Sequence, residues 1–234
     1  ASIKAMLRQD PNVIVIGEIR DPETAAAAID AAQTGHLVLT TLHTSNAVAA
    51  VTRLMDLDVP AYLLGGALAG VVAQRLVRKV CPECSVPANP VPEDWERVGL
   101  PPIELGPAAR RAGPGCPACQ YMGYDGRLGV FELLPFSSEM GQLIQSGADE
   151  HTLWARAREE GMRTVYEDAI QKVREGKTTL EELARVVPVG DYPRAVMQGT
   201  IRALKTAQAA RGAPTPDPTA VPEPPRPEPT VAAN

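Results

Sequence analysis

The sequence predicts an α/β fold in which helices cover a parallel sheet, followed by a metal-stapled insertion and a helical C-terminal region. Residues 1–79 alternate between helical and strand patterns with short turns between them, as the βα units of a parallel sheet do. Residues 80–126 lose that periodicity and contain two cysteine pairs. Residues 127–187 begin with a strand pattern and continue with amphipathic helical periodicity.

Composition and charge limit the classes of function. The chain has 234 residues, of which 44% are hydrophobic, enough for one core of ordinary size with a small appendage. A net charge of -5 provides no general attraction to nucleic acid or to an anionic membrane. The most apolar stretch, residues 59–73, is shorter than the roughly 20 residues that span a bilayer. We therefore expect no nucleic-acid partner and no transmembrane segment. The chain starts with Ala1 rather than methionine, and we expect a further N-terminal portion.

The first elements follow from apolar runs and capping residues. Residues 13–16 are a run of β-branched residues, which predicts a central strand buried on both faces. Asp21 is placed to cap the next helix, and Gly35 follows the end of that helix. Residues 37–42 form a second apolar run and predict a second buried strand. Residues 46–73 predict two helices.

The rest of the chain divides into three parts. Residues 80–126 are rich in proline and glycine and predict an insertion without regular periodicity. Residues 127–134 predict a strand, and residues 139–187 predict three or four amphipathic helices. Residues 188–234 are predicted to be a linker and a disordered tail, because eight of the 23 prolines fall within its last 22 residues.

An acidic residue follows the first predicted strand. Glu18 comes directly after Gly17 at the carboxyl end of residues 13–16, where open parallel sheets bind their ligands. In an enzyme that cleaves phosphates, an acid at this place holds magnesium or orients and deprotonates the attacking water. The alternative is a carboxylate that only pairs with Arg20 or with a nearby lysine.

Two histidines flank the second predicted strand. His43 lies just past residues 37–42, beside the point where Glu18 should leave the sheet. A histidine there can donate a hydrogen bond to a terminal phosphate or sense its loss. His36 opens the same strand at its other end. A purely structural hydrogen bond is the alternative for both histidines, and it is the favoured one for His36.

These segments resemble a known family. RQDPNVIVIGEIRDPETA and TGHLVLTTLHTSNA resemble the Walker B and His-box segments of the secretion ATPase superfamily, the motors of type II secretion and type IV pili. The resemblance covers residues 1 to about 187 and implies a RecA-like P-loop NTPase core that uses ATP and Mg²⁺. It also implies that Glu18 is the catalytic Walker B glutamate and that His43 contacts the phosphate. Gly17 stands where a generic Walker B strand has aspartate, as is usual in this superfamily.

Basic positions also match the family. Arg8 and Arg75 correspond to positions that are usually basic in the superfamily, so the resemblance implies nucleotide-binding roles for Arg8, Gly17, His36 and Arg75. Surface or packing roles are an equal alternative for the two arginines.

The phosphate-binding loop of the family is missing. No GxxxxGK[ST] pattern occurs in the 234 residues, and the acidic box that normally precedes Walker B is missing too. We therefore expect little ATP turnover from this chain alone. The resemblance implies the C-terminal, incomplete part of a cytoplasmic homo-hexameric motor, held at the inner membrane by a platform protein and other secretion or pilus assembly components. The alternative is a free-standing, non-catalytic, zinc-stapled module that binds motor subunits or the platform protein.

The cysteines form two CxxC pairs, Cys81 with Cys84 and Cys116 with Cys119. This spacing turns two sulfurs toward one tetrahedral zinc ion. A site closed by four cysteines leaves no position for water, so the zinc would be structural. Thiol exchange is the alternative. The charged residues between the pairs form no phosphate-binding face; they are Glu93, Asp94, Glu96, Arg97, Glu104, Arg110 and Arg111. An insertion of this kind resembles those of the extension and secretion motors.

Overall fold

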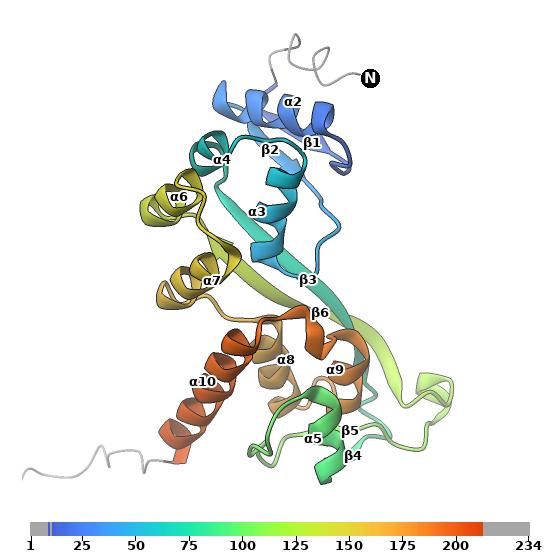
Figure 1. Ribbon diagram of the computed structural model, residues 1–234. Coiled ribbons are helices and arrows are strands. Elements are labelled where there is room, and N and C mark those ends of the chain that lie inside the picture. Colours follow the sequence, from blue (N-terminus) through green and yellow to red (C-terminus); the bar gives the residue numbers. More distant parts are fainter. Residues whose placement is uncertain (1–8, 10, 213–234) are drawn as a thin grey trace, which may run out of the picture.

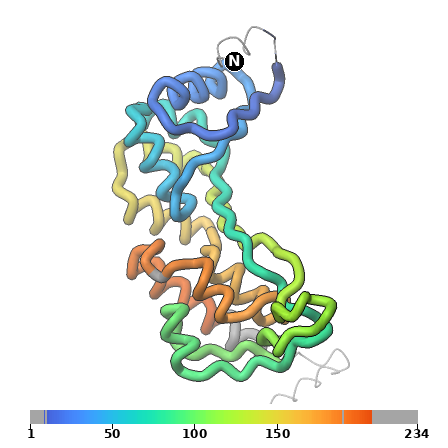
Figure 2. Tube along the Cα trace, turned by 90° about the vertical axis from the view of Figure 1, so that its right-hand side faces the viewer, coloured from blue at the N-terminus to red at the C-terminus, as the bar shows by residue number. Residues whose placement is uncertain are grey.

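The computed structural model describes residue 9 and residues 11–212. Arg8 and the proline-rich tail, residues 213–234, lie outside this part of the chain. The molecule is elongated, with two long strands running along it (Figure 1; Figure 2). The described residues contain helices and three two-stranded sheets, which confirms the predicted mixed α/β class.

The first βαβ unit forms one end of the molecule. Strand β1, Val13–Ile16, pairs in parallel with β2, Leu37–Thr40, and helix α2, Pro22–Gln33, connects them. The amide of Thr24 donates to Asp21 Oδ1 at 2.8 Å, so Asp21 caps α2 as predicted. Gly35 follows the helix with φ 96°, a conformation that favours glycine.

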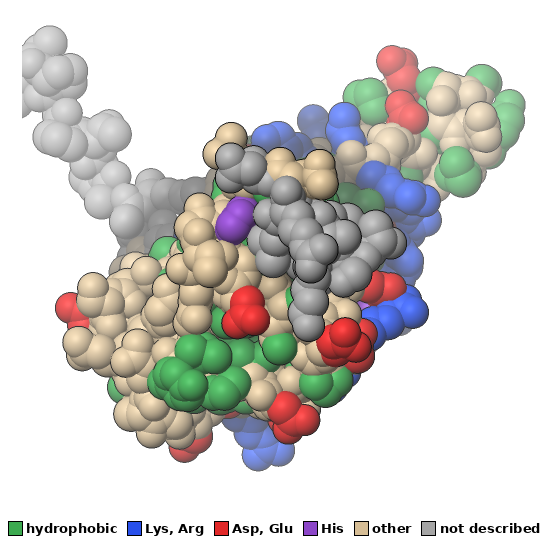
Figure 3. All heavy atoms as spheres, turned by 90° about the horizontal axis from the view of Figure 1, so that it is seen from above, with side chains coloured by type: hydrophobic (Ala, Val, Ile, Leu, Met, Phe, Trp, Pro, Cys, Tyr) green, Lys and Arg blue, Asp and Glu red, His purple; other side chains and the backbone are tan. Residues whose placement is uncertain are grey.

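The prediction that these strands are buried on both faces is wrong for the part of the chain that the structure describes. Ile14 is 3% exposed, but Val15 is 69% exposed and Leu39 is 51% exposed. Helix α2 covers only one side of the pair (Figure 1), and the apolar side chains of the other side reach solvent. Figure 3, which views this end of the molecule, shows hydrophobic side chains at the surface among polar and acidic ones.

Two helices follow, as predicted, but the second is shorter than expected. Helix α3 spans Ala47–Asp56 and α4 spans Ala61–Ala67. The chain then enters strand β3, Gly70–Val80, so the helical prediction is wrong for residues 70–73. These residues pair antiparallel with strand β6, with Val72 opposite Leu133, and this long-range pairing overrides the local helical pattern.

Strands β3 and β6 form a long ribbon with one covered face. Strand β6 spans Tyr124–Pro135 and contains the predicted strand 127–134. Val77, Val130 and Leu134 are fully buried on one face of the ribbon, while Phe131 is 45% exposed on the other. The covered face packs against α3 and α8 and carries the central part of the core.

Four α-helices lie between β6 and residue 187, in agreement with the three or four helices predicted for residues 139–187. Each begins after a Ser, Thr or Asp whose side chain accepts a backbone hydrogen bond. The helices are α6, Ser138–Gln145; α7, Glu150–Glu159; α8, Val165–Arg174; and α9, Leu180–Val186.

The insertion contributes more to the core than its composition suggests. It contains the short strands β4, Val86–Pro87, and β5, Arg110–Arg111, with helix α5, Pro92–Val98, between them and a 3₁₀ turn η1, Pro117–Cys119. Trp95 and Val98 are buried where α5 contacts α9. The insertion is therefore packed against the helical region as well as held by its cysteines.

The predicted linker from residue 188 is wrong as far as residue 212. A 3₁₀ turn η2, Val189–Asp191, leads into helix α10, Arg194–Gly212. Tyr192, Val196 and Leu204 are buried, so apolar side chains hold this segment against the body of the molecule. Within the described part of the chain, no helix has the length and apolarity needed to cross a membrane.

Candidate functional site

Glu18 and His43 meet at one edge of the β1–β2 pair. Thr41 Oγ1 donates to the Gly17 carbonyl at 2.6 Å, and the Ile19 amide donates to the Thr41 carbonyl at 3.1 Å. These bonds extend the strand contact past the ends of β1 and β2. His43 Nε2 lies 2.7 Å from Glu18 Oε2. The structure thus brings together the two side chains that the sequence placed at the same edge.

Glu18 also forms an ion pair with Arg20 through its other carboxylate oxygen. The hydrogen bond with His43 and the contacts with Arg20 lower the pKa of Glu18 below its usual value, although partial burial acts in the opposite direction. The carboxylate is therefore ionised at neutral pH. The Glu18 and His43 side chains are 30% and 80% exposed, so a ligand in solution can reach them.

This arrangement offers one acceptor and one donor at an open edge. An ionised carboxylate can accept a hydrogen bond from water or bind a divalent cation, and an imidazole can donate to a phosphate oxygen. The pairing of Glu18 with Arg20 matches the alternative considered for the sequence, and it coexists with the His43 contact. The roles of both residues in catalysis remain predictions.

His36 is not brought to this edge. Its Nδ1 lies 2.9 Å from the Ala31 carbonyl oxygen and 3.2 Å from Thr34 Oγ1. Both contacts tie it to the C-terminal end of α2, at the opposite end of β2 from His43. A nucleotide-binding role for His36 stays a prediction, and its contacts match the structural alternative.

Gly17 directly precedes Glu18, and Arg75 contacts a residue shortly after His43. Arg75, on β3, donates to the Ser45 carbonyl at 2.8 Å and lies 3.8 Å from Asp191, so it contacts the loop that follows His43. At Gly17, a Cβ atom would meet no heavy atom within 4 Å, so the packing does not require glycine there. Their nucleotide-binding roles stay predictions.

Sequence reasoning missed two polar residues near the site. Asn46 caps α3 by accepting from the Ala49 amide at 2.8 Å and is 2% exposed; its signal was a good capping residue ahead of an apolar helix. Glu132 is 1% exposed within β6. An acid between Phe131 and Leu133 is expected on the solvent side, and no local pattern shows that it faces the core.

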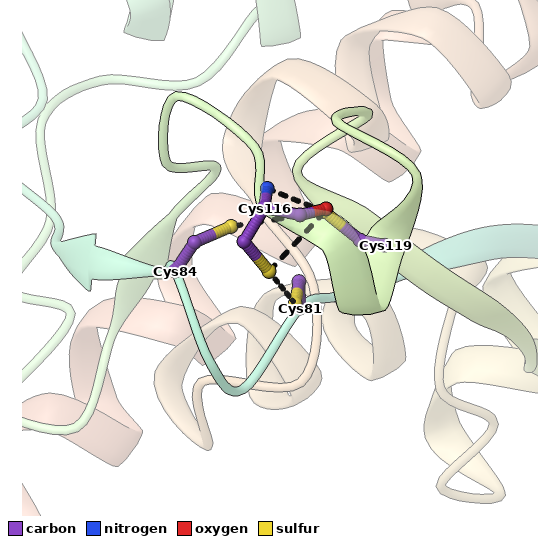
Figure 4. A group of neighbouring side chains, drawn as sticks. All are labelled: Cys81, Cys84, Cys116 and Cys119. Carbon is purple, nitrogen blue, oxygen red and sulfur yellow. Dashed lines mark hydrogen bonds between the residues drawn. The ribbon is translucent and has the colours of Figure 1, made fainter.

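The four cysteines gather into one cluster (Figure 4). Their sulfur atoms all lie within 4.8 Å of one another. Cys81 Sγ is 3.8 Å from Cys116 Sγ, and Cys84 Sγ is 3.9 Å from Cys119 Sγ. In a tetrahedral zinc site with Zn–S bonds of about 2.3 Å, neighbouring sulfurs are about 3.8 Å apart. A disulfide needs about 2.05 Å, and all four cysteines are free.

The backbone around the cysteines favours thiolates and close turns. The amides of Cys116 and Gly123 donate to Cys119 Sγ at 3.3 Å and 3.2 Å and lower its pKa to about 6 against the effect of burial. A Cβ at Gly113 would lie 1.6 Å from the Cys84 carbonyl oxygen, so only glycine fits there. The donor set is compatible with a structural zinc ion.

Burial acts against a full set of thiolates. It raises the pKa of Cys84 to about 12, so the sulfurs would not all ionise by themselves. A divalent cation among them would supply the positive charge that stabilises four thiolates. The four-sulfur donor set is therefore compatible with a resident metal ion, which would hold the thiolates in their ionised form.

Comparison with known proteins agrees with the family resemblance found in the sequence. The family described as Type II/IV secretion system protein matches residues 1–185. The type IV pilus assembly ATPase PilB of Thermus thermophilus is 46% identical over 187 residues, which are 80% of this chain and 21% of the relative. The type II secretion system protein HxcR of Pseudomonas aeruginosa is 45% identical over 185 residues, 79% of this chain and 35% of the relative.

Solved structures share the fold. The pilus retraction motor PilT, solved with bound ADP, aligns with a TM-score of 0.52 and 25% identity over 82% of this chain and 42% of that chain. The ATPase DotB of Legionella pneumophila aligns with a TM-score of 0.52 and 22% identity, covering 77% of this chain and 40% of the other. The chain thus spans well under half the length of these proteins.

Proposed function

The chain belongs to the type II/IV secretion system protein family, and on that premise we propose that it is the C-terminal part of an ATPase that powers type II secretion or type IV pilus assembly. The observation that carries the proposal is the Glu18–His43 pair, joined at 2.7 Å where two parallel strands end. A nucleotide site at the carboxyl edge of a parallel sheet is the usual arrangement in α/β proteins.

In this proposal Glu18 prepares the attacking water. Its pKa is lowered chiefly by the hydrogen bond with His43, so at neutral pH it is an ionised acceptor that can orient a water molecule and take up its proton. Mg²⁺, when bound with ATP, neutralises charge that develops on the phosphates. In this proposal Glu18 would bind that ion directly or through water.

His43, in the same proposal, donates a hydrogen bond to the terminal phosphate of ATP. Its side chain is 80% exposed, and Glu18 holds its Nε2. A phosphate oxygen could replace Glu18 as the acceptor of a hydrogen bond from the His43 imidazole. The Glu18 carboxylate would then be free to bind water. The pair therefore connects the presence of the γ-phosphate to the availability of Glu18.

The larger assembly is also part of the proposal. We place the chain in a RecA-like core whose phosphate loop comes from a preceding part of a longer protein, because PilB and HxcR extend well beyond the matched region. We further propose a homo-hexamer in the cytoplasm, peripheral to the inner membrane through a platform protein, with zinc bound by the four cysteines. Gly17 directly precedes Glu18, and Arg75 contacts Ser45, two residues after His43; in this proposal both contribute to nucleotide binding.

The test is Glu18→Gln in the full-length protein that carries this chain. Glutamine cannot accept the proton, so we expect ATP turnover to fall by a factor on the order of 100 or more, while ATP binding is retained. The matched control is Glu23→Gln, which removes a similar exposed carboxylate from the first turn of α2. Unchanged turnover in the Glu18 variant would remove this residue from the catalytic role.

A full-length wild-type protein that binds its partners but shows no ATP turnover would instead support the non-catalytic interaction module. Measuring hydrolysis and partner binding on the same preparation separates these functions.

A further inference from the structure

The C-terminal segment packs directly against the loop that follows His43. Residues 188–204, here called the C-terminal clamp, comprise η2 and the first part of α10. They lie beyond residues 1–185, where the family match ends. Helix α10 runs beside α8 (Figure 1) and contacts it. The clamp therefore adds contacts to the site that the matched region alone does not supply.

The first contact fixes Ser45 and Asn46. Asn46 Nδ2 donates to the Asp191 carbonyl at 2.9 Å, while its Oδ1 caps α3. Arg75 donates to the Ser45 carbonyl at 2.8 Å and lies 3.8 Å from the Asp191 carboxylate. Asn46 is 2% exposed, so its own bonds are largely shielded from water and their loss would leave buried polar groups unpaired. The bond from Arg75 to Ser45 is exposed.

The second contact fixes Ala47 through a buried carboxylate. Glu132 Oε1 accepts from the Ala47 amide at 2.7 Å, and Oε2 accepts from the Tyr192 hydroxyl at 2.8 Å and the Val165 amide at 3.4 Å. Glu132 thereby joins the N-termini of α3 and α8 to the clamp. Burial raises the pKa of Glu132, and these donors oppose that effect, so each donor helps to keep the carboxylate ionised.

Aromatic packing holds the Tyr192 hydroxyl in place. The Tyr192 ring makes edge-to-face contacts with Trp154 and Tyr166, each with a 5.6 Å separation between ring centroids. Tyr192 is 6% exposed. Packing on both rings fixes the orientation of Tyr192, so its hydroxyl is held in position to donate to Glu132.

These contacts leave the His43 loop anchored on both sides. Before His43, Thr41 is bonded to Gly17 and Ile19. After His43, the Ser45 carbonyl accepts from Arg75, Asn46 donates to Asp191 of the clamp, and the Ala47 amide donates to Glu132. The second anchor depends on Asp191 and Tyr192, which lie more than 140 residues further along the chain than the His43 loop.

We propose that Asp191 and Tyr192 are positioning residues for ATP hydrolysis, which act through Asn46 and Glu132 to hold the loop that carries His43. This inference rests on the proposed ATPase function. A small displacement of a catalytic group can reduce the rate on the order of 100-fold, so loosening the anchor should lower kcat more than it changes KM for ATP.

The test is Tyr192→Phe in the full-length protein. This change keeps the aromatic ring and removes the hydroxyl that donates to Glu132. We expect kcat to fall on the order of tenfold with KM for ATP altered less than about threefold, and amide hydrogen exchange over residues 43–47 to become faster. Ala47 should show the clearest change, because Glu132 accepts its amide.

The matched control is Tyr166→Phe. Tyr166 is also buried and packs on Tyr192, but its hydroxyl donates to the Val187 carbonyl at 3.0 Å. It should match Tyr192→Phe in any loss of thermal stability and keep wild-type kcat. Equal kcat in the two variants, or exchange over residues 43–47 unchanged by Tyr192→Phe, would overturn the proposal.

A second variant covers the case in which Tyr192→Phe fails to fold. Asn46→Ser keeps a good capping residue for α3 and removes the donor to Asp191, so it should lower kcat in the same way. Wild-type kcat in Asn46→Ser would overturn the proposal. Glu18→Gln, measured in parallel, separates the two hypotheses: if it keeps full turnover, the proposed function fails, whereas clamp variants without effect beside an inactive Glu18→Gln refute only the clamp.

Discussion

The cysteine cluster and the Glu18–His43 edge differ in how completely this chain builds them. Cys81 and Cys119 are 1% and 2% exposed. All four sulfurs lie within 4.8 Å of one another, and the Cys81–Cys116 and Cys84–Cys119 pairs are 3.8 Å and 3.9 Å apart. Backbone amides of the same insertion bond to Cys119. The Glu18 and His43 side chains are 30% and 80% exposed, and they rise from strands with one apolar face in solvent. The first site is closed, and the second is open.

The difference follows from the range of the interactions that build each site. Each CxxC pair is created by one tight turn, so the metal site needs only two short segments to approach each other. A site at the edge of a parallel sheet needs neighbouring strands, covering helices and loops on several sides. Exposed Val13, Val15, Leu37 and Leu39 mark the side on which the β1–β2 pair has no cover within the described residues.

The largest expected effect comes from the closed site. Cys119→Ser should abolish stoichiometric zinc binding and unfold the insertion, because structural zinc contributes on the order of 10 kcal/mol in small zinc domains. Metal analysis and thermal unfolding measure both consequences, with about one zinc per chain expected for the wild type. Glu83→Gln, an exposed change inside the first CxxC pair, is the control. Reversible Cys81–Cys84 oxidation without bound metal would instead favour thiol exchange.

The next largest loss of folding stability is expected at the ion cluster that joins β3 to α9. Glu182 is fully buried and accepts hydrogen bonds from Arg78 and Arg185 at 2.7–2.9 Å. Glu182→Ala removes a buried carboxylate that accepts from two half-exposed arginines, and should reduce the free energy of unfolding by about 2–3 kcal/mol. Urea denaturation measures this. The exposed neighbour Glu181→Ala should change it by less than about 0.5 kcal/mol, and equal costs would contradict this account.

The same cluster predicts a dependence of stability on pH. Burial raises the pKa of Glu182, but the hydrogen bonds with Arg185 and Arg78 outweigh it and lower this pKa to about 2 from 4.5. A carboxyl group whose pKa is lower in the folded state than in the unfolded state stabilises the folded protein at pH values above its unfolded-state pKa. Stability should therefore fall as the pH drops from about 4.5 to about 2, by roughly 3 kcal/mol. Glu182→Gln should lack this component in unfolding curves recorded across that range.

The smallest effect is expected on the open face. Val15 is 69% exposed, so Val15→Ser should change the stability of the 234-residue chain by less than about 0.5 kcal/mol. Ile14→Ala, one residue away on the buried face, should cost about 2–5 kcal/mol. In the longer protein, Val15→Ser should cost more than about 1 kcal/mol if another segment covers this face. A cost that is equally small in both proteins would show that the face stays open.

The sequence by itself determined the features that depend on local spacing. Asp21 as a helix cap, the two CxxC pairs, and the acid and histidine at the ends of two strands could all be predicted. The last prediction worked because parallel strands end at the same edge of a sheet, so Glu18 and His43 had to be neighbours. Burial of β1 and β2 on both faces could not be judged in this way, because covering a sheet requires partners that an apolar pattern does not identify.

Tertiary structure alone decided which side of β6 became the core. Phe131 and Leu133 point to solvent, while Glu132 is buried between Val130 and Leu134, the reverse of what polarity suggests. Glu132 is tolerated inside because Ala47, Tyr192 and Val165 all donate to it. These donors belong to three separate elements, and no local pattern contains them.

Tertiary structure also decided the fate of residues 188–212. Their sequence predicts a linker before a proline-rich tail, because one helix with a weak apolar pattern has little stability of its own. In the folded protein, Tyr192 packs on Trp154 and Tyr166, and Asp191 meets Asn46. The segment is ordered by surfaces that exist only after the rest of the chain has folded, so its role could be read only in three dimensions.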